Sequence, residues 1–119
     1  MKVREKYIQS YVHNGHIGVL VEFGLESSVT ARLEEFVAFT KDLAMHIAAA
    51  KPSDVEELLG QKFIKDTSIS IGELIQKVSE TISEGISVTR FERWDTEPVP
   101  PKSEGPPPKS PAVAMRVVK

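Results

Sequence analysis

The sequence contains no cysteine, which excludes a disulfide framework, a thiolate metal site and a cysteine nucleophile. No apolar run approaches the length that spans a bilayer, and the N-terminus lacks the apolar segment of a signal peptide. A net charge of -2 argues against binding nucleic acid by neutralising phosphates. We therefore expect a cytoplasmic protein that binds neither membranes nor nucleic acid. An organelle matrix stays open as a location if a transit peptide has been removed.

Proline is rare in most of the chain, because seven of the eight prolines lie between Pro98 and Pro111. Apolar residues make up 40% of the 119 residues and are concentrated before Trp94. This predicts one small folded domain over residues 1–94, followed by an extended proline-rich tail over residues 95–119. The last eight residues, AVAMRVVK, are apolar again. A frayed end is favoured for so short a segment, and a strand that docks on a sheet edge is the alternative.

The longest amphipathic stretch is VTARLEEFVAFTKDLAMHIAAA, residues 29–50. Its apolar residues recur every three or four positions, which predicts one helix with a single apolar face. Serine or threonine at the start can cap the helix, and Pro52 ends it. His46 lies beside the apolar stripe, so we expect a half-buried surface position, with contact to a partner as the alternative. A helix this one-sided needs a flat apolar surface to pack against.

Two apolar runs flank Asn14-Gly15, a pair that favours a two-residue type I′ turn and hence a β-hairpin. This turn would pair His13 with His16. One face of the hairpin, facing the helix, would then carry Ile8, Val12, Ile17, Val19 and Val21. The other face would carry Tyr7, Gln9, Tyr11, Leu20 and Glu22. Tyr7, Tyr11 and Leu20 are apolar enough together to indicate a binding partner for that face.

Two S-x-x-E capping boxes, Ser53 with Glu56 and Ser70 with Glu73, predict a short helical turn and a further helix. Residues 86–94 are rich in β-branched and aromatic side chains, which predicts a strand beside the hairpin. Its imperfect alternation allows a bulge. The predicted fold is α+β: a three-stranded antiparallel sheet, made of the N-terminal hairpin and the C-terminal strand, with helices packed on one face.

No combination of residues indicates catalysis. His13 and His16 flank the turn, but a metal site needs more protein ligands than this pair, so we expect solvated histidines. The sequence has no nucleophile-elbow, zinc-protease, phosphate-loop or dinucleotide motif. We expect no catalytic residue, no bound metal and no cofactor, and therefore not an enzyme.

Several stretches of the sequence also resemble a known protein family. Four stretches of the sequence closely resemble the core domain of elongation factor Ts, and they occur in the same order as there. They are IQSYVHNGHIGVLVEF, ARLEEFVAFTKDLAMHIAAAKP, LLGQKFIKDTS and ISIGELIQKVSETISEGISVTRFERW. The resemblance covers about residues 6–94. It implies a three-stranded antiparallel sheet with helices on one face, in agreement with the layout above. It also implies a guanine-nucleotide exchange factor whose partner is the GTPase elongation factor Tu.

The resemblance has three departures. The family's N-terminal helical module is missing, and the helical hairpin that follows the proline is reduced to residues 53–60. The family's exchange element reads glutamate–threonine–aspartate–phenylalanine, and its aligned residues here are Glu26, Ser27, Ser28 and Val29. Serine has no charge to disturb a metal site and valine is no aromatic wedge, so any exchange activity should be weak.

Two functions remain. The first is a reduced elongation factor Ts that binds elongation factor Tu and promotes GDP release. The second is a non-enzymatic interaction module that forms a homodimer through the open sheet face. The residues expected to bind a partner are Glu26, Ser27, Ser28 and Val29 of the exchange-element position, and Tyr7, Tyr11, Leu20 and His46 of the sheet face and helix end.

Overall fold

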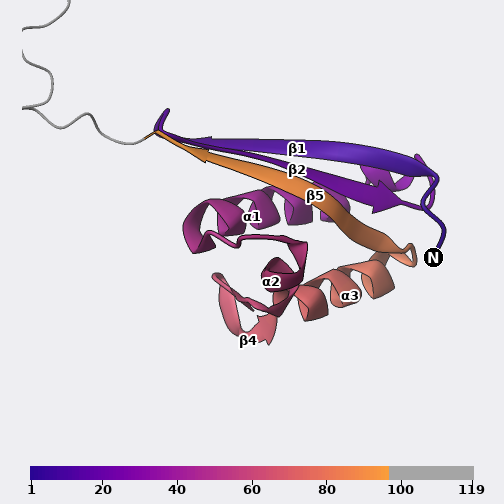
Figure 1. The fold of residues 1–119 in the computed structure, drawn as a ribbon. Coiled ribbons are helices and arrows are strands. Elements are labelled where there is room, and N and C mark those ends of the chain that lie inside the picture. The colour runs from indigo at the N-terminus through magenta and orange to yellow at the C-terminus, as the bar shows by residue number, and fades with distance from the viewer. Residues whose placement is uncertain (97–119) are drawn as a thin grey trace, which may run out of the picture.

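The structure is a computed structural model that describes residues 1–96. Its elements in chain order are β1 (Glu5–His13), β2 (Ile17–Leu25), the 3-10 helix η1 (Thr30–Arg32), α1 (Glu34–Ala50), α2 (Val55–Gly60), β3 (Lys62–Phe63), β4 (Asp66–Ser70), α3 (Ile71–Ile82) and β5 (Ile86–Asp95). Strands β1, β2 and β5 form an antiparallel sheet in the order β1-β2-β5, and the helices lie on one side of it (Figure 1). The predicted α+β fold is confirmed. The expected character of residues 97–119 lies outside the described residues.

The hairpin forms as predicted, but its register is shifted by one residue. Asn14 and Gly15 both have positive φ angles, as the turn requires, and the His16 N–H donates to the His13 carbonyl at 3.0 Å. The residue opposite His13 in the ladder is nevertheless Ile17, and His16 is left as a third loop residue. Because side chains alternate between faces, this shift moves every side chain of β1 to the face opposite the predicted one.

The shifted register is held by what β1 packs against. Tyr7 meets the ring of Phe36 edge-on, with ring centroids 5.2 Å apart. The Gln9 amide donates to the Thr40 hydroxyl at 2.8 Å, and Tyr11 packs at the margin of the core. Aromatic packing and a hydrogen bond on the covered face therefore outweigh the burial of two aliphatic side chains of β1.

The long helix is shorter at its start than predicted. Residues 30–32 form η1, Leu33 is extended, and α1 begins at Glu34 without a side-chain cap. Thr30 does not cap a helix, because its hydroxyl donates to the Glu84 carboxylate at 3.2 Å. The C-terminal end agrees with the prediction: α1 ends at Ala50, and Lys51 takes the left-handed conformation.

The core lies between α1 and the sheet, and its centre is aromatic. Phe23 of β2 packs edge-on against Phe36 and Phe39 of α1, with both centroid distances 5.7 Å. Leu58, Ile71 and other buried apolar side chains extend this core towards α2 and α3. Fifteen apolar residues of the described chain are buried, which makes this two-layer core the main source of stability.

The part of the chain from α2 to β5 contains one wrong prediction, and its other predictions are confirmed. The N-cap of α2 is Asp54, which accepts from the Glu57 N–H, so the predicted box at Ser53 and Glu56 is wrong by one residue. The capping box of Ser70 with Glu73 before α3 is confirmed in both directions. Strand β5 joins the hairpin as predicted, with β2 as its partner, and its expected bulge falls where Thr89 lies between the partners of Glu22 and Phe23.

Candidate functional site

The face of the β1-β2-β5 sheet opposite α1 is not covered by any other described residue, and we call it the open face. Its apolar side chains are Ile8 and Val12 of β1, Leu20 of β2 and Trp94 of β5, which are 57%, 66%, 52% and 75% exposed. Leu20 lies on this face as predicted. Tyr7 and Tyr11 do not: the register shift places both on the covered side, so their predicted place on the open face is wrong.

A hollow lies on the open face between Val12, Leu20 and Trp94. Val12 and Trp94 both lie opposite Gly18, one on each neighbouring strand. Gly18 has no side chain, and no other atom lies within 4 Å of the position its Cβ would take. The result is an apolar depression of about 230 Å³, with the carboxylate of Glu92 at its rim. The hollow has the character of a docking site for a small apolar group.

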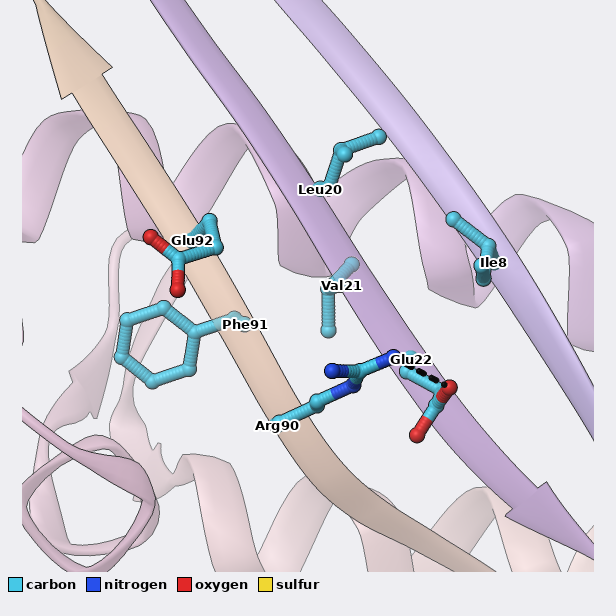
Figure 2. A pocket seen from close by; sticks show the side chains of 7 residues that line it. All are labelled: Ile8, Leu20, Val21, Glu22, Arg90, Phe91 and Glu92. Carbon is cyan, nitrogen blue, oxygen red and sulfur yellow. Dashed lines mark hydrogen bonds and ion pairs between the residues drawn. The ribbon is translucent and has the colours of Figure 1, made fainter.

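A second, smaller depression of about 160 Å³ lies beyond Leu20, lined by Ile8 and Phe91 among others. Figure 2 shows Arg90 reaching from β5 towards Glu22 at one end of this depression and Glu92 at the other. The open face thus combines an apolar centre with charged groups, here from β2 and β5.

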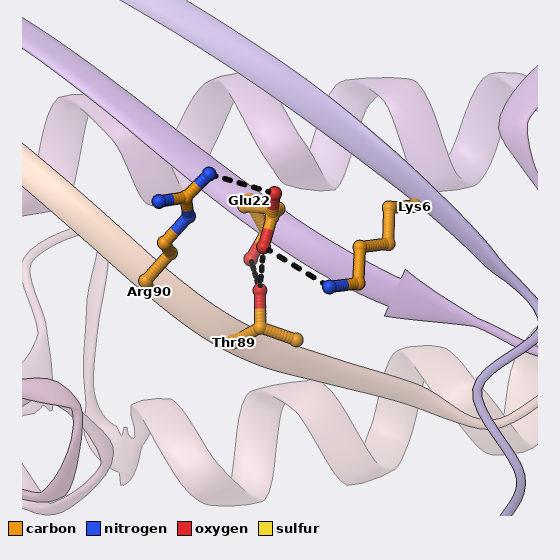
Figure 3. Close-up of polar contacts among 4 residues, drawn as sticks. All are labelled: Lys6, Glu22, Thr89 and Arg90. Atoms are coloured by element: carbon orange, nitrogen blue, oxygen red, sulfur yellow. Dashed lines mark hydrogen bonds and ion pairs between the residues drawn. The ribbon is translucent and has the colours of Figure 1, made fainter.

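Glu22 is the centre of a polar cluster that spans all three strands (Figure 3). The bulge residue Thr89 donates to Glu22 Oε1 at 2.5 Å, Arg90 Nη2 lies 3.4 Å from Oε2, and Lys6 Nζ lies 3.8 Å from Oε1. The hydrogen bond from Thr89, helped by the two cations, lowers the pKa of the Glu22 carboxyl below its usual range. Glu22 is therefore a carboxylate at neutral pH whose charge is already balanced by this cluster.

The loop of Glu26, Ser27, Ser28 and Val29 connects β2 to η1, and it is anchored at its base. The Ser27 hydroxyl donates to Glu84 Oε1 at 3.3 Å, the same oxygen that Thr30 reaches. Glu26 lies against Gly85, where an added Cβ would come within 2.9 Å of its carboxylate. Val29 is 59% exposed. The loop therefore exposes an apolar side chain next to an uncharged Ser28.

His46 is fully buried, so the expectation of a half-buried surface position is wrong. Its Nδ1 accepts from the Ile64 N–H at 3.3 Å, and its Nε2 therefore carries the hydrogen that it shares with Gln61 Oε1 at 2.9 Å. Burial lowers the pKa of His46, although the hydrogen bond to Gln61 acts in the opposite direction. A neutral His46 thus joins the end of α1 to the segment around β3, and it does not reach the surface.

The two histidines of the turn are exposed, as predicted. His13 Nδ1 lies 2.8 Å from the Tyr11 hydroxyl, and His16 Nδ1 lies 3.1 Å from the Thr96 hydroxyl. Within residues 1–96 no group of three or more histidine, aspartate or glutamate side chains could hold a metal ion. None of the helices described here combines the length and apolar character that crossing a membrane requires.

Sequence reasoning missed Arg93, which joins the sheet to the helix. Its guanidinium donates from Nε and Nη2 to the Ala48 carbonyl at 3.1 and 2.9 Å, so it satisfies a backbone acceptor in the last turn of α1. It also missed Ile8, Val12 and Trp94 on the open face. A register based on a three-residue turn would have placed the two β1 residues correctly.

The chain is similar to proteins of known family. Residues 1–58 match the family model described as Elongation factor TS. Elongation factor Ts of Alkaliphilus oremlandii is 29% identical, with 76% of this chain and 63% of the relative covered. The relative from Rubrobacter xylanophilus is 30% identical (79% and 72% covered), and the chloroplastic elongation factor Ts of Rhodomonas salina is 31% identical (76% and 63%).

The chain spans less than two thirds of the length of the Alkaliphilus oremlandii relative. That alignment extends over 136 residues, more than the 119 of this chain, so the relative carries residues with no counterpart here. This agrees with the shortened segment at residues 53–60, around α2, that the sequence indicates.

Proposed function

Because the chain belongs to the elongation factor Ts family, we propose that it binds elongation factor Tu and promotes the release of GDP, at a low rate. The observation that carries this proposal is the family match over the hairpin, the Glu26–Val29 loop and α1. An exchange factor performs no covalent step. It binds the nucleotide-free GTPase more tightly than the GDP-bound form, and by reciprocity it weakens GDP binding.

The loop supports the binding part of this proposal. It is anchored through the hydrogen bonds of Ser27 and Thr30 to Glu84, and it exposes Val29, which is the arrangement of a preformed contact. A preformed loop loses little conformational entropy on binding. The low rate follows from Ser28 and Val29, which offer neither a negative charge nor an aromatic ring to displace the nucleotide's metal and phosphate contacts.

The test is the release of fluorescent GDP from elongation factor Tu of the same source, with and without the chain, alongside a pull-down. We expect complex formation and slow acceleration. The double variant Ser28→Asp/Val29→Phe should raise the rate, whereas Ser28→Asn/Val29→Phe, which has the same shape without the charge, should raise it less. If neither the native chain nor the first variant binds the GTPase or changes the rate, the proposal is wrong.

A second function is favoured by the open face. Four exposed apolar side chains, three of them around a hollow, are typical of an interaction surface, so a module that pairs with a second copy, without exchange activity, is the alternative. Sedimentation equilibrium, together with the GDP-release assay, distinguishes this alternative from the exchange factor. A mass that doubles with concentration, together with no effect on GDP release, supports the alternative. A monomer at all concentrations contradicts self-association.

A further inference from the structure

The described chain ends beside the hollow of the open face. Trp94 forms one wall of this hollow, and Thr96 is held near the hairpin turn by its N–H, which donates to the His16 carbonyl at 2.9 Å. The fifteen residues 97–111 then separate this point from the apolar segment 112–119. At about 3.1 Å per residue for an extended proline-rich chain, they can reach about 45 Å, whereas a nine-residue strand is only about 30 Å long. The closing segment can therefore reach any part of the open face.

The composition of residues 112–119 matches the hollow. Six of the eight residues are apolar, and the other two are the cations Arg116 and Lys119. The hollow is apolar with Glu92 at its rim, and within residues 1–96 Glu92 has no ion-pair partner, in contrast to Glu22. An apolar segment with positive charge therefore complements this surface in both respects.

A competing groove lies on the other side of the same end of the sheet. It has a volume of about 260 Å³ and is lined by Tyr11, His13, Ile17, Met45, Ala48, Ala49 and Ile64. None of these residues is a carboxylate, so the groove offers no partner for the two cations. The charges therefore favour the open face.

We propose that residues 112–119 of the same chain bind over the hollow between Val12, Leu20 and Trp94, with the cations of the segment beside Glu92. A short tether raises the effective concentration of the segment to the millimolar range, so even an affinity of order 1 mM keeps much of the hollow covered. The segment then competes with any partner for the open face. This inference does not depend on an action on elongation factor Tu.

Trp94 is the single tryptophan of the chain, so its fluorescence reports on the hollow directly. The test compares the full chain with the variant Val113→Asp/Met115→Asp, by emission maximum and by quenching with acrylamide. We expect the native chain to protect Trp94 and the variant to lose this protection, with a red-shifted emission. The control Ser103→Asp/Ser110→Asp adds the same two charges to the linker and should keep the protection. All four residues lie outside the core of residues 1–96, so the fold is unaffected.

A charge exchange tests the position of the segment. Glu92→Lys should reduce the protection of Trp94, and adding Arg116→Glu and Lys119→Glu to that variant should restore it. Equal quenching of the native chain and the Val113→Asp/Met115→Asp variant overturns the proposal. Protection that grows with protein concentration, in step with a dimer mass, also overturns it, because a second copy would then cover the hollow.

Discussion

The two faces of the β1-β2-β5 sheet are built by alternate residues of the same strands, yet they have opposite surroundings. On the covered face, Val21 and Phe23 are at most 1% exposed beneath α1. On the open face, Ile8 and Val12 are more than half exposed. Hydrophobicity by itself does not explain this division, because β1 turns its two tyrosines inward and these aliphatic residues outward. The open face thus keeps exposed apolar residues that pack against no described helix.

Among changes that test this contrast between the two faces, Phe36→Ala on the covered side should lower stability the most. Phe36 is fully buried between Tyr7, Phe23 and Phe39, so its truncation leaves a cavity in the aromatic centre. We expect the free energy of unfolding to fall by about 3–5 kcal/mol, measured by urea denaturation. A loss below about 1 kcal/mol would mean that the core closes around the gap, and the contrast between the faces would be weaker than described.

A fall in pH should lower the free energy of unfolding by an intermediate amount, through His46 on the covered side. Burial lowers its pKa in the folded state, so the unfolded chain binds a proton more readily. The contribution of neutral His46 to the free energy of unfolding is therefore fully present well above the ordinary pKa of 6.5. It falls as the pH drops through that value, until the folded-state pKa is passed. Urea denaturation of the native chain and of His46→Gln, whose amide does not titrate in this range, should show a steeper loss for the native chain. Parallel pH profiles would contradict the buried neutral state of His46.

The smallest effect on stability should come from Leu20→Ser at the centre of the open face. Leu20 is half exposed and supports no described helix, so we expect the free energy of unfolding to change by no more than about 0.5 kcal/mol. The same variant should weaken whatever covers the hollow, which quenching of Trp94 can measure. A large loss of stability with unchanged quenching would show that Leu20 belongs to the core.

The sequence predicted the elements well where the signal was local. The Ser70–Glu73 capping box, the positive φ angles at Asn14-Gly15 and the apolar stripe of α1 all depend on residues a few positions apart, and all three are confirmed. The addition of β5 to the hairpin was also predicted, whereas its pairing with β2 and not with β1 comes from the structure. The presence of an exposed sheet face followed from the same layout.

What the sequence could not predict depends on contacts between distant residues. The register of β1 is decided by Tyr7 on Phe36 and by Gln9 on Thr40, and a single-residue shift exchanges all of its faces. The start of α1 is decided by Thr30, whose hydroxyl bonds to Glu84 and not to a helix N–H. Buried His46 likewise depends on Gln61 and Ile64. In each case the partner of the side chain lies far away in the sequence, so only the folded chain brings the two together.

By itself, then, the sequence determined the fold class, the order of the main helices and strands, and the family, because these follow from periodicity, local turn chemistry and motifs. The short elements η1, β3 and β4 were not predicted. The tertiary structure decided which side chains of β1 face outward, how the Glu26–Val29 loop is anchored and where the hollow beside Trp94 lies. The physical reason is the alternation of a β-strand. A shift of one residue costs little in local geometry, so packing against α1 determines which side chains of β1 stay exposed.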